Sequence, residues 1–416
     1  MELIVFEQDK CYVRRNLENG EIDYLEVVSE GAETEFFQYI AGRGILRHLA
    51  ESYPLRRRKR EVPLWLYIAS DLSLRLHGMQ SFHGYPFVVR TGGMLNAFGP
   101  EVGKKVVHPQ TGQVTIHCPG FNRKNRYDRQ TPCDQDWLRK TARATAWEKL
   151  LDWYNREIPR LLGKEKLFDS EGIFIGDASY VFVPDNPHYE GSVVMLFDEH
   201  NHPVDEKKLT PAQLRRCRLR RCYKWVELMH TNSSGDFFFF VAMHLGSGKA
   251  NECPILYELV ENFLEVVGSG VMKWLIVDRG FLDGGRIGHL KKKWKVDTVS
   301  GLRSDMAVLE DARGLLRLGP GKWQEYHPPE KQPPEALPQP TDKQSRKRKE
   351  EQAPRVEKVI ALNHLTSWES CPVELTVVLT EQEEAPPWGL VTTYPTRDAP
   401  FIRRMYHLRE SIEERH

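Results

Sequence analysis

Two aspartates stand in apolar surroundings, where an uncompensated carboxylate would be costly. Asp177 lies inside the run Ile173-Phe-Ile-Gly-Asp-Ala-Ser-Tyr-Val, and Asp278 closes the run Trp274-Leu-Ile-Val. Both runs have the length and composition of buried strands. A buried carboxylate is tolerated when it is paired or binds a cation, so two of them at one point predict a divalent metal site. Two such ions could activate the attacking oxygen and stabilise the leaving oxygen of a phosphodiester.

A third acid, Glu413, lies close to the last residue of the sequence. Tyr406, Arg409 and Glu413 are spaced by three and four residues, so they share one face of a helix expected from about residue 399. Glu413 could ligate metal, Arg409 could contact a phosphate with two N–H groups, and Tyr406 could donate a hydrogen bond. Each feature alone is commonplace, since an Asp at a strand end is most often a cap and such a helix face is most often solvated. Their combination predicts phosphoryl-transfer chemistry.

The elements around the aspartates follow a recognisable order. Three strands are expected first, at 173–181, 223–229 and 237–245. They are followed by a helix at 254–267, a strand at 274–278, a helix at 285–294 and a strand at 296–302. An antiparallel meander extended by parallel crossovers is the order of an RNase H-like domain. In such a mixed α/β sheet the strands that carry Asp177 and Asp278 are neighbours.

The rest of the chain divides by composition. We expect an N-terminal α+β region at residues 1–165 and a catalytic core at 166–305. An insertion is expected at 306–398 and a catalytic helix at 399–416. In the first region a hairpin is expected over 1–30 and helices over 33–53 and 134–162. The segment 319–356 is dense in Pro, Gln, Lys and Glu, which predicts a disordered loop. Strands are expected after it at 357–365, 373–380 and 388–394.

The composition is that of an ordinary globular protein. The 416 residues carry a formal net charge of +1, so any DNA contact must come from local basic patches. Such patches occur at 55–60, 121–129 and 214–221. No apolar run approaches the ~18 residues of a membrane span, and the acidic N-terminus is unlike a signal peptide. Seven cysteines in this chain predict neither a disulfide framework nor, by their spacing, a zinc site.

Several motifs resemble those of the cut-and-paste DDE transposases of bacterial insertion sequences. Asp278-Arg-Gly-Phe resembles their second-aspartate motif, Tyr406-His-Leu-Arg-Glu-Ser-Ile-Glu413 resembles their Tyr–Arg–Glu–Lys signature, and Leu390-Val-Thr-Thr resembles the last strand of their β-insertion. The intervals agree, at 278 − 177 = 101 and 413 − 278 = 135 residues. The resemblance covers roughly residues 171–416. It departs at Glu410, where the family usually has Trp, and at the signature Lys, which would fall beyond residue 416.

The resemblance implies an RNase H-like sheet with a β-strand insertion between Asp278 and Glu413. It also implies a transposase that cleaves DNA at transposon ends and transfers the freed strand, with two Mg²⁺ or Mn²⁺ ions held by Asp177, Asp278 and Glu413. The expected partners are terminal inverted repeats and target DNA, bound by a homodimer in the cytoplasm at the nucleoid, with no membrane. DNA contacts are expected from Tyr406, Arg409, Arg279, Trp388, Arg56, Arg57, Arg58, Arg123 and Arg126. Among these, Trp388 takes the place of a Trp that holds a flipped base in the family.

Two other functions remain open. One is a catalytically dead remnant that binds transposon ends without cutting them, and the other is a host RNase H-like nuclease. The missing signature Lys also leads us to expect a C-terminally truncated chain with weak activity, because Glu413 would lie in the last, fraying turn of its helix.

Overall fold

The structure is a computed structural model that describes part of the 416-residue chain. The described residues are 10–21, 31–55, 62–85, 104–107, 109–111, 114–117, 133–319, 321–329, 356–383 and 385–413. The chain forms two compact units, Met1–Glu157 and Ile158–His416. The predicted DNA contacts Arg56, Arg57, Arg58, Arg123 and Arg126 lie outside the described residues.

The first unit is an α+β region, as expected. Its elements are α1 (Lys10–Glu18), α2 (Gly31–Gly42), α3 (Ile45–Ser52), α4 (Leu64–Leu76), the 3-10 turn η1 (Phe82–Gly84), the antiparallel pair β1 (Lys104–Val107) and β2 (Val114–His117), and α7 (Gln135–Ala144). Helix α8 (Trp147–Lys164) crosses the boundary between the units. The core of the first unit holds fully buried Leu66, Leu74, Tyr85 and Leu138.

Three expectations for this unit were wrong in detail. The hairpin over 1–30 is contradicted by helix α1, after which Gly20 adopts a φ of +71°, as glycines that follow a helix often do. The helix expected over 33–53 is broken at Gly44, whose φ is +69°. The helix expected over 134–162 is broken at Thr145, which has an extended backbone and donates its hydroxyl to Thr141 O at 3.1 Å.

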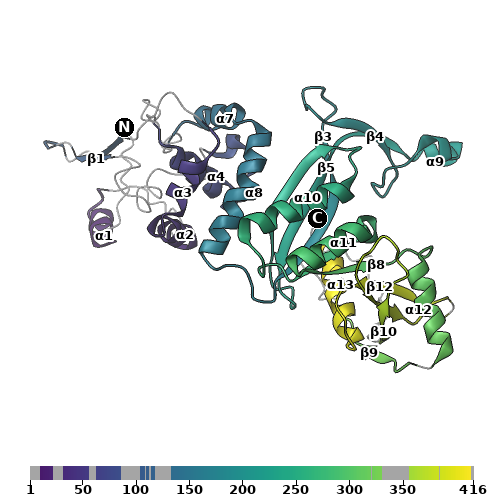
Figure 1. Cartoon of the computed structure of the whole chain (residues 1–416). Helices are drawn as coiled ribbons and strands as arrows, with labels where there is room; N and C mark the ends of the chain where they lie inside the picture. The colour runs from purple at the N-terminus through teal and green to yellow at the C-terminus, as the bar shows by residue number, and fades with distance from the viewer. Residues whose placement is uncertain are drawn as a thin grey trace, which may run out of the picture. The chain divides into compact units, whose positions relative to one another are not determined.

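The second unit is built on one ten-stranded mixed sheet (Figure 1). Its first six strands are β3 (Ile173–Val183), β4 (Val193–Phe197), β5 (Arg218–Thr231), β6 (Phe238–Ser247), β7 (Trp274–Val277) and β8 (Asp297–Gly301). Strands β3, β7 and β8 are parallel neighbours, and β3 pairs antiparallel with β5, which pairs antiparallel with β6. The spatial order β6-β5-β3-β7-β8 is that of an RNase H-like core, which confirms the predicted fold class.

The insertion extends the same sheet instead of forming a separate layer. Strand β12 (Trp388–Thr392) pairs with β8, and β11 (Leu375–Thr380), β10 (Glu357–Leu365) and β9 (Gln324–Tyr326) follow in antiparallel order. Strand β9 contradicts part of the disordered loop expected over 319–356, because buried Tyr326 pairs with Glu357 there. Residues 330–355 of that loop lie outside the described residues.

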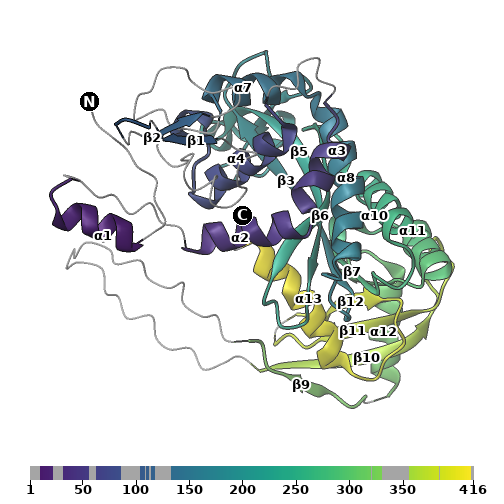
Figure 2. The same cartoon turned by 90° about the vertical axis from the view of Figure 1, so that its left-hand side faces the viewer.

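Helices cover both faces of the sheet (Figure 2). Helices α10 (Glu252–Val267), α11 (Gly284–His289) and α12 (Ala307–Leu318) supply one hydrophobic core, together with the 3-10 turn η5 (Arg279–Phe281) and the π-helical turn η6 (Leu290–Trp294). Helix α13 (Ala399–Glu413) lies on the opposite face, where Ile402, Met405 and Leu408 pack with Ile175 and Ile276. No helix among the described residues is long and apolar enough to cross a membrane.

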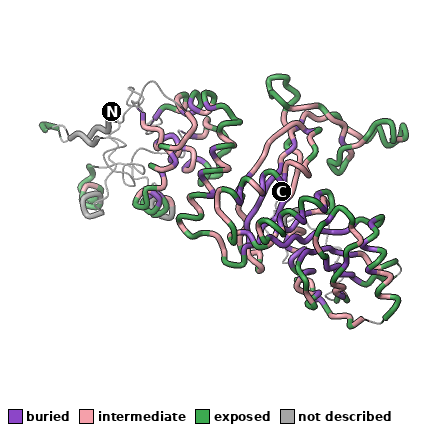
Figure 3. The backbone as a smooth tube through the Cα atoms, viewed as in Figure 1, coloured by how far each residue is buried: buried purple, intermediate pink, exposed green. Residues whose placement is uncertain are grey.

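Between β3 and β5 the chain forms elements that the sequence did not predict. Strand β4, the 3-10 turn η4 (Glu206–Lys208) and the short helix α9 (Pro211–Leu214) fill this stretch. Strands β4 and β6 share one edge of the long strand β5: β4 pairs with Arg218–Cys222, and β6 with Tyr223–Thr231. Strand β4 and helix α9 therefore project beyond the rest of the sheet (Figure 1), and much of the projection is exposed (Figure 3).

Candidate active site

The strand register brings Asp177 and Asp278 side by side. Gly176 of β3 is the parallel partner of Val277 of β7, so the next residue along each chain is one of the two aspartates. Neighbouring strands lie about 4.8 Å apart. Because side chains alternate along a strand, both aspartates fall on the same face as Ile175 and Ile276, which is the face that α13 covers. The face below is closed, since a Cβ on Gly176 would come within 2.6 Å of the side chain of Leu256.

The carboxylate of Asp278 interacts with one backbone N–H and with one guanidinium of this chain. One carboxylate oxygen, Oδ1, accepts the backbone N–H of Arg279 at 2.6 Å, so Asp278 caps the turn η5. The other, Oδ2, lies 3.5 Å from Nη2 of Arg409. The side chain is 35% exposed and remains reachable from solvent. The carboxylate thus serves both as a cap and as an ion-pair partner.

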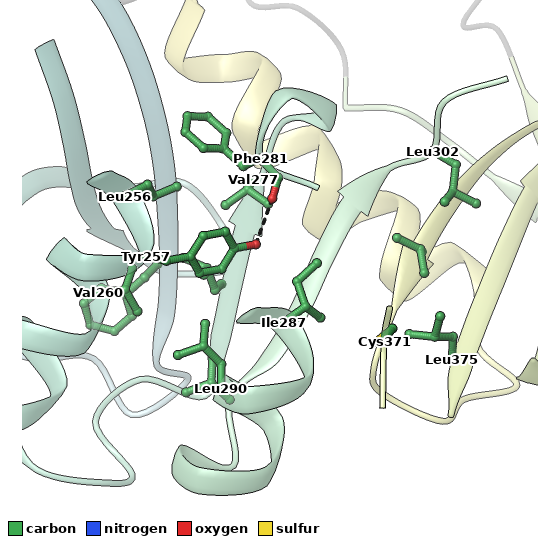
Figure 4. Packing of buried hydrophobic residues seen from close by; sticks show 14 of the residues in the cluster. Leu256, Tyr257, Val260, Val277, Phe281, Ile287, Leu290, Leu302, Cys371 and Leu375 are labelled. Atoms are coloured by element: carbon green, nitrogen blue, oxygen red, sulfur yellow. Dashed lines mark hydrogen bonds between the residues drawn. The ribbon is translucent and has the colours of Figure 1, made fainter. Parts of the chain in front are cut away.

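The turn that follows Asp278 is anchored from below. The hydroxyl of Tyr257 in α10 donates a hydrogen bond to the carbonyl oxygen of Phe281 at 2.8 Å (Figure 4). Burial raises the pKa of Tyr257 well above its usual value, so the hydroxyl keeps its proton as a donor. Phe281 itself is buried among Val277 and Leu256. The position of Asp278 is therefore fixed by the core beneath it.

Helix α13 places Tyr406 and Arg409 above this strand end. Tyr406 is nearly buried, and its hydroxyl oxygen lies only 3.0 Å from the point where a Cβ on Gly301 would stand. Burial is the main reason that the pKa of Tyr406 is raised; the Asp278 charge also raises it and the Arg409 charge opposes the shift. The phenol is consequently neutral and able to donate. Glu413 is the last residue of α13, and its side chain lies outside the described ones.

Sequence reasoning missed a further acid, Glu227. It is the antiparallel partner of Asp177 on β5 and therefore shares its face, and it is only 1% exposed. The indole N–H of Trp225 donates to its Oε2. The signal was present in the sequence, since Glu227 interrupts the apolar run of a predicted strand just as Asp177 does.

Trp388 begins β12 and lies half-buried beside α13. Its ring centroid is 6.5 Å from that of Tyr406, and the guanidinium carbon of Arg403 lies 5.2 Å from the Trp388 centroid. Arg403 is 5% exposed and donates to both carboxylate oxygens of Glu357, from Nε at 2.8 Å and from Nη2 at 3.2 Å. One face of Trp388 is therefore covered by an arginine that also joins α13 to β10.

Glu410 has a structural role in this network. It accepts from Nη1 of Arg403 at 3.4 Å and pairs with Nδ1 of His407 at 2.9 Å. The close pairing with His407, followed by the charge of Arg403, holds the pKa of Glu410 below its usual value despite burial. Glu410 therefore joins two cationic side chains of α13.

A shallow basic pocket of about 530 Å³ opens beside Asp278. It is lined by Arg279, Gly280, Arg303, Ser304 and Asp305, which follow the ends of β7 and β8. Nε of Arg303 lies 3.7 Å from Asp305, and both side chains are more than half exposed. Two arginines at the edge of the sheet that carries the aspartates could receive backbone phosphates.

The donor set suits a hard cation, although it is only partly described. Among the described residues, no group of three or more His, Cys, Asp and Glu side chains is arranged to hold a metal ion. The expected third ligand, Glu413, has no described side chain. Asp177 and Asp278 supply oxygen donors from adjacent strands, and one or two carboxylates with additional phosphate and water oxygens are what Mg²⁺ prefers. The residues present therefore fit the expected ions.

Comparison with known proteins bears on the same region. A family model described as the transposase DDE domain matches residues 190–415, more than half of the chain. The match contains Asp278, Arg409 and Glu413 and begins 13 residues after Asp177 (190 − 177). The curated proteins give no significant match. Among solved structures, a piggyBac transposase synaptic complex with hairpin DNA is similar at 10% identity and a TM-score of 0.33, over 96% of this chain and 63% of that one.

Proposed function

Because this chain belongs to the transposase DDE-domain family, we propose that it cleaves DNA at transposon ends and joins the freed 3′ ends to target DNA. The observation that carries the proposal is the register of β3 and β7, which sets Asp177 beside Asp278 under the helix that bears Tyr406 and Arg409. The expected partners are the terminal inverted repeats and target DNA, bound by a homodimer.

Asp177, Asp278 and Glu413 would hold two Mg²⁺ or Mn²⁺ ions. When bound, such ions make the attacking oxygen nucleophilic and stabilise the leaving oxygen. The hydrogen bond from Arg279 N–H to Asp278 and the Tyr257–Phe281 hydrogen bond below it support this role, because they hold the carboxylate in place. Glu413 ends the helix whose residue Arg409, one turn earlier, already contacts Asp278.

The cationic and phenolic groups would orient the DNA strand. The guanidinium of Arg409 holds Asp278 through Nη2 and has further N–H donors in a planar fork that suits a phosphate. The neutral Tyr406 hydroxyl can donate to a phosphate oxygen. Arg279 and Arg303 line the adjacent pocket and suit the next phosphates of the same strand.

Other DNA contacts are proposed at the edge of the site and in the first unit. Trp388, which is half-buried, would stack on an unpaired base; such stacking contributes ~1–3 kcal/mol per base. The basic runs containing Arg56, Arg57, Arg58, Arg123 and Arg126 would contact the DNA backbone.

The test is divalent-metal-dependent nicking of a plasmid that carries the element's inverted repeats. We expect Asp177→Asn, Asp278→Asn and Glu413→Gln each to reduce nicking by about 100-fold or more, because each removes an anionic oxygen donor. The matched control is Asp311→Asn, which changes an exposed side chain of α12 and should cut normally. Calorimetric titration with Mn²⁺ should show weakened binding in the three variants, independently of cleavage.

Three outcomes would overturn the proposal. Normal cleavage by Asp278→Asn would remove the residue from the chemistry. Binding of the repeats by the unaltered chain without cutting in Mg²⁺ or Mn²⁺ would identify a catalytically dead remnant. Cleavage that is equal with and without the terminal repeats would indicate a nuclease.

A further inference from the structure

The projection between β3 and β5 carries a concentrated positive charge. We call residues 184–222 the arm. Its last stretch, Lys207–Arg221, holds seven Lys and Arg residues and no Asp or Glu, in a chain whose net charge is only +1. The acids of the arm all precede this stretch, within 185–206. The arm therefore ends in a local cationic surface, which has no role in the active site described above.

The arm's basic residues fall into two groups. Arg220 and Arg221 are structural: the Arg220 guanidinium lies 3.4 Å from the centroid of the Phe182 ring, and Arg221 lies 3.0 Å from Asp185. The other five are exposed, and within the described part of the chain none of them forms an ion pair with an acid: Lys207, Lys208, Arg215, Arg216 and Arg218. Two of the seven cationic side chains thus contribute contacts within the arm, and the other five are exposed to solvent.

Like charges gathered without partners repel one another, so the cluster weakens the isolated fold and is suited to an anionic partner. The partner must also accept an extended row of cations. Arg216 and Arg218 flank Cys217, and Arg218 begins β5, so the row runs along the entry to a strand. A polyanion with regularly spaced charges meets this description, and duplex DNA carries one phosphate per ~1.7 Å of its axis.

Strand β5 links the cluster rigidly to the active site. Glu227, the partner of Asp177, and Arg218 stand on the same unbroken strand, nine residues apart (227 − 218). At about 3.3 Å per residue this separation is about 30 Å. Since duplex DNA rises about 3.4 Å per base pair, a duplex that ran along β5 would span this separation in roughly nine base pairs.

We propose that the arm is a DNA-backbone clamp that grips the duplex through Arg215, Arg216 and Arg218 close to one helical turn from the cleaved bond. This inference rests on the proposed function for its choice of duplex DNA. It adds a contact that is independent of the catalytic groups, because no residue of the cluster touches Asp177, Asp278 or α13.

The test compares two triple variants of the full chain with the same change in charge. The arm variant is Arg215→Gln/Arg216→Gln/Arg218→Gln. The control is Lys293→Gln/Arg317→Gln/Lys358→Gln, which removes three exposed cations that do pair with acids, Glu261, Glu310 and Glu381. Duplex binding is measured without divalent metal over a series of salt concentrations. Circular dichroism verifies that both variants fold.

For a 40-base-pair duplex we expect the arm variant to bind about tenfold or more weakly. For this variant, the slope of log K against log salt concentration should be shallower by about 2.7, which is ~0.9 for each of three lost phosphate contacts. The control should keep the slope of the unaltered chain. On duplexes that end about five base pairs from the cleaved bond on both sides, the arm cannot reach the DNA, so all three proteins should bind alike.

The failure of this inference is distinguishable from the failure of the proposed function. If the unaltered chain cuts DNA and the arm variant keeps its salt slope, the clamp is wrong and the function stands. If the chain never cuts but the arm variant loses slope, the clamp stands and the function is wrong. Preferential loss of duplex RNA binding, or a changed oligomeric state in ultracentrifugation with an unchanged slope, would also overturn the clamp.

Discussion

Gly301 ends β8 directly beneath the phenol of Tyr406, and its lack of a side chain sets how closely α13 approaches the sheet. We expect Gly301→Ala to push Tyr406 outward by a few tenths of an ångström, because the new Cβ would stand 3.0 Å from the hydroxyl oxygen and 3.6 Å from Cζ. Misplacement of this size should slow plasmid nicking by roughly tenfold with little loss of stability.

The control for this substitution is Gly314→Ala in α12. A Cβ there meets nothing within 4 Å, and alanine favours the helix by about 0.5–1 kcal/mol, so this variant should be slightly more stable and cut normally. Nicking rates and melting temperatures measured together decide the matter. Equal nicking by both variants would mean that the close approach of Tyr406 does not matter to the reaction.

At the residue scale, sequence reasoning named the aspartate pair together with Tyr406, Arg409 and Arg279, but it missed Glu227 and Arg403. Asp177 and Asp278 could be brought together because the order of strands fixes which ones are neighbours. Glu227 could have been found by the same argument of a charge inside an apolar run. Arg403 could not, since its partner Glu357 is 46 residues away and only the assembled sheet brings the two together.

Among the elements, α13 depends on ion pairs as well as on its apolar face. Arg403 is 5% exposed and bridges Glu357 of β10 to Glu410 of its own helix. Arg403→Gln should destabilise the second unit by about 2–3 kcal/mol, which is less than a fully buried pair would give because the two carboxylates are 22% and 41% exposed. Urea unfolding monitored by tryptophan fluorescence measures the change.

Two companion variants make this measurement specific. Lys358 is on β10 beside Glu357, and Lys358→Gln breaks its exposed pair with Glu381. This variant should change the free energy of unfolding by less than about 1 kcal/mol. Arg403→Lys keeps the charge but not the two-pronged geometry, so its stability should fall between those of the unaltered chain and Arg403→Gln. Equal stability of Arg403→Gln and Lys358→Gln would contradict a stabilising role for the ion pairs of Arg403.

The sequence predicted the strands and helices of the RNase H-like core well, because each has a clear apolar period. It did worse where periodicity was interrupted or weak. Gly44 and Thr145 break what read as continuous helices, and β9 is a three-residue strand whose existence depends on β10. The arm has too few buried positions to leave a pattern, so β4 and α9 were not predicted.

The stability of the second unit as a whole should depend on pH through His230. This fully buried ring donates from Nδ1 to Ile173 O at 2.9 Å and accepts the Asp169 N–H at Nε2 at 2.8 Å, so it is neutral in the fold. Burial lowers the pKa of His230 below the usual value of 6.5. A depressed pKa means that the unfolded chain binds the proton more readily, so stability is complete above pH 6.5 and falls as the pH drops below it.

Urea unfolding between pH 7.5 and 5 measures this effect. We expect the pH dependence to be shallower in His230→Gln, which is less stable than the unaltered chain at pH 7.5 because it loses packing with Phe174 and Phe168. The control His200→Gln alters an exposed ring and should leave the unfolding midpoint at pH 7.5 unchanged. An identical pH dependence in His230→Gln and the unaltered chain would rule out His230 as the source.

The continuity of the sheet from β8 into β12 has a consequence for synthesis on the ribosome. Strand β8 acquires its second neighbour only when residues 388–392 emerge, and Arg409 reaches Asp278 later still. Chains grow at about 5–20 residues per second, so the interval between β8 and α13 lasts several seconds. During that interval the nascent chain already carries the arm and both aspartates, but not the helix that completes the site. Any competence to cut DNA must therefore arise only after α13 has emerged, well after the strands that carry the two aspartates.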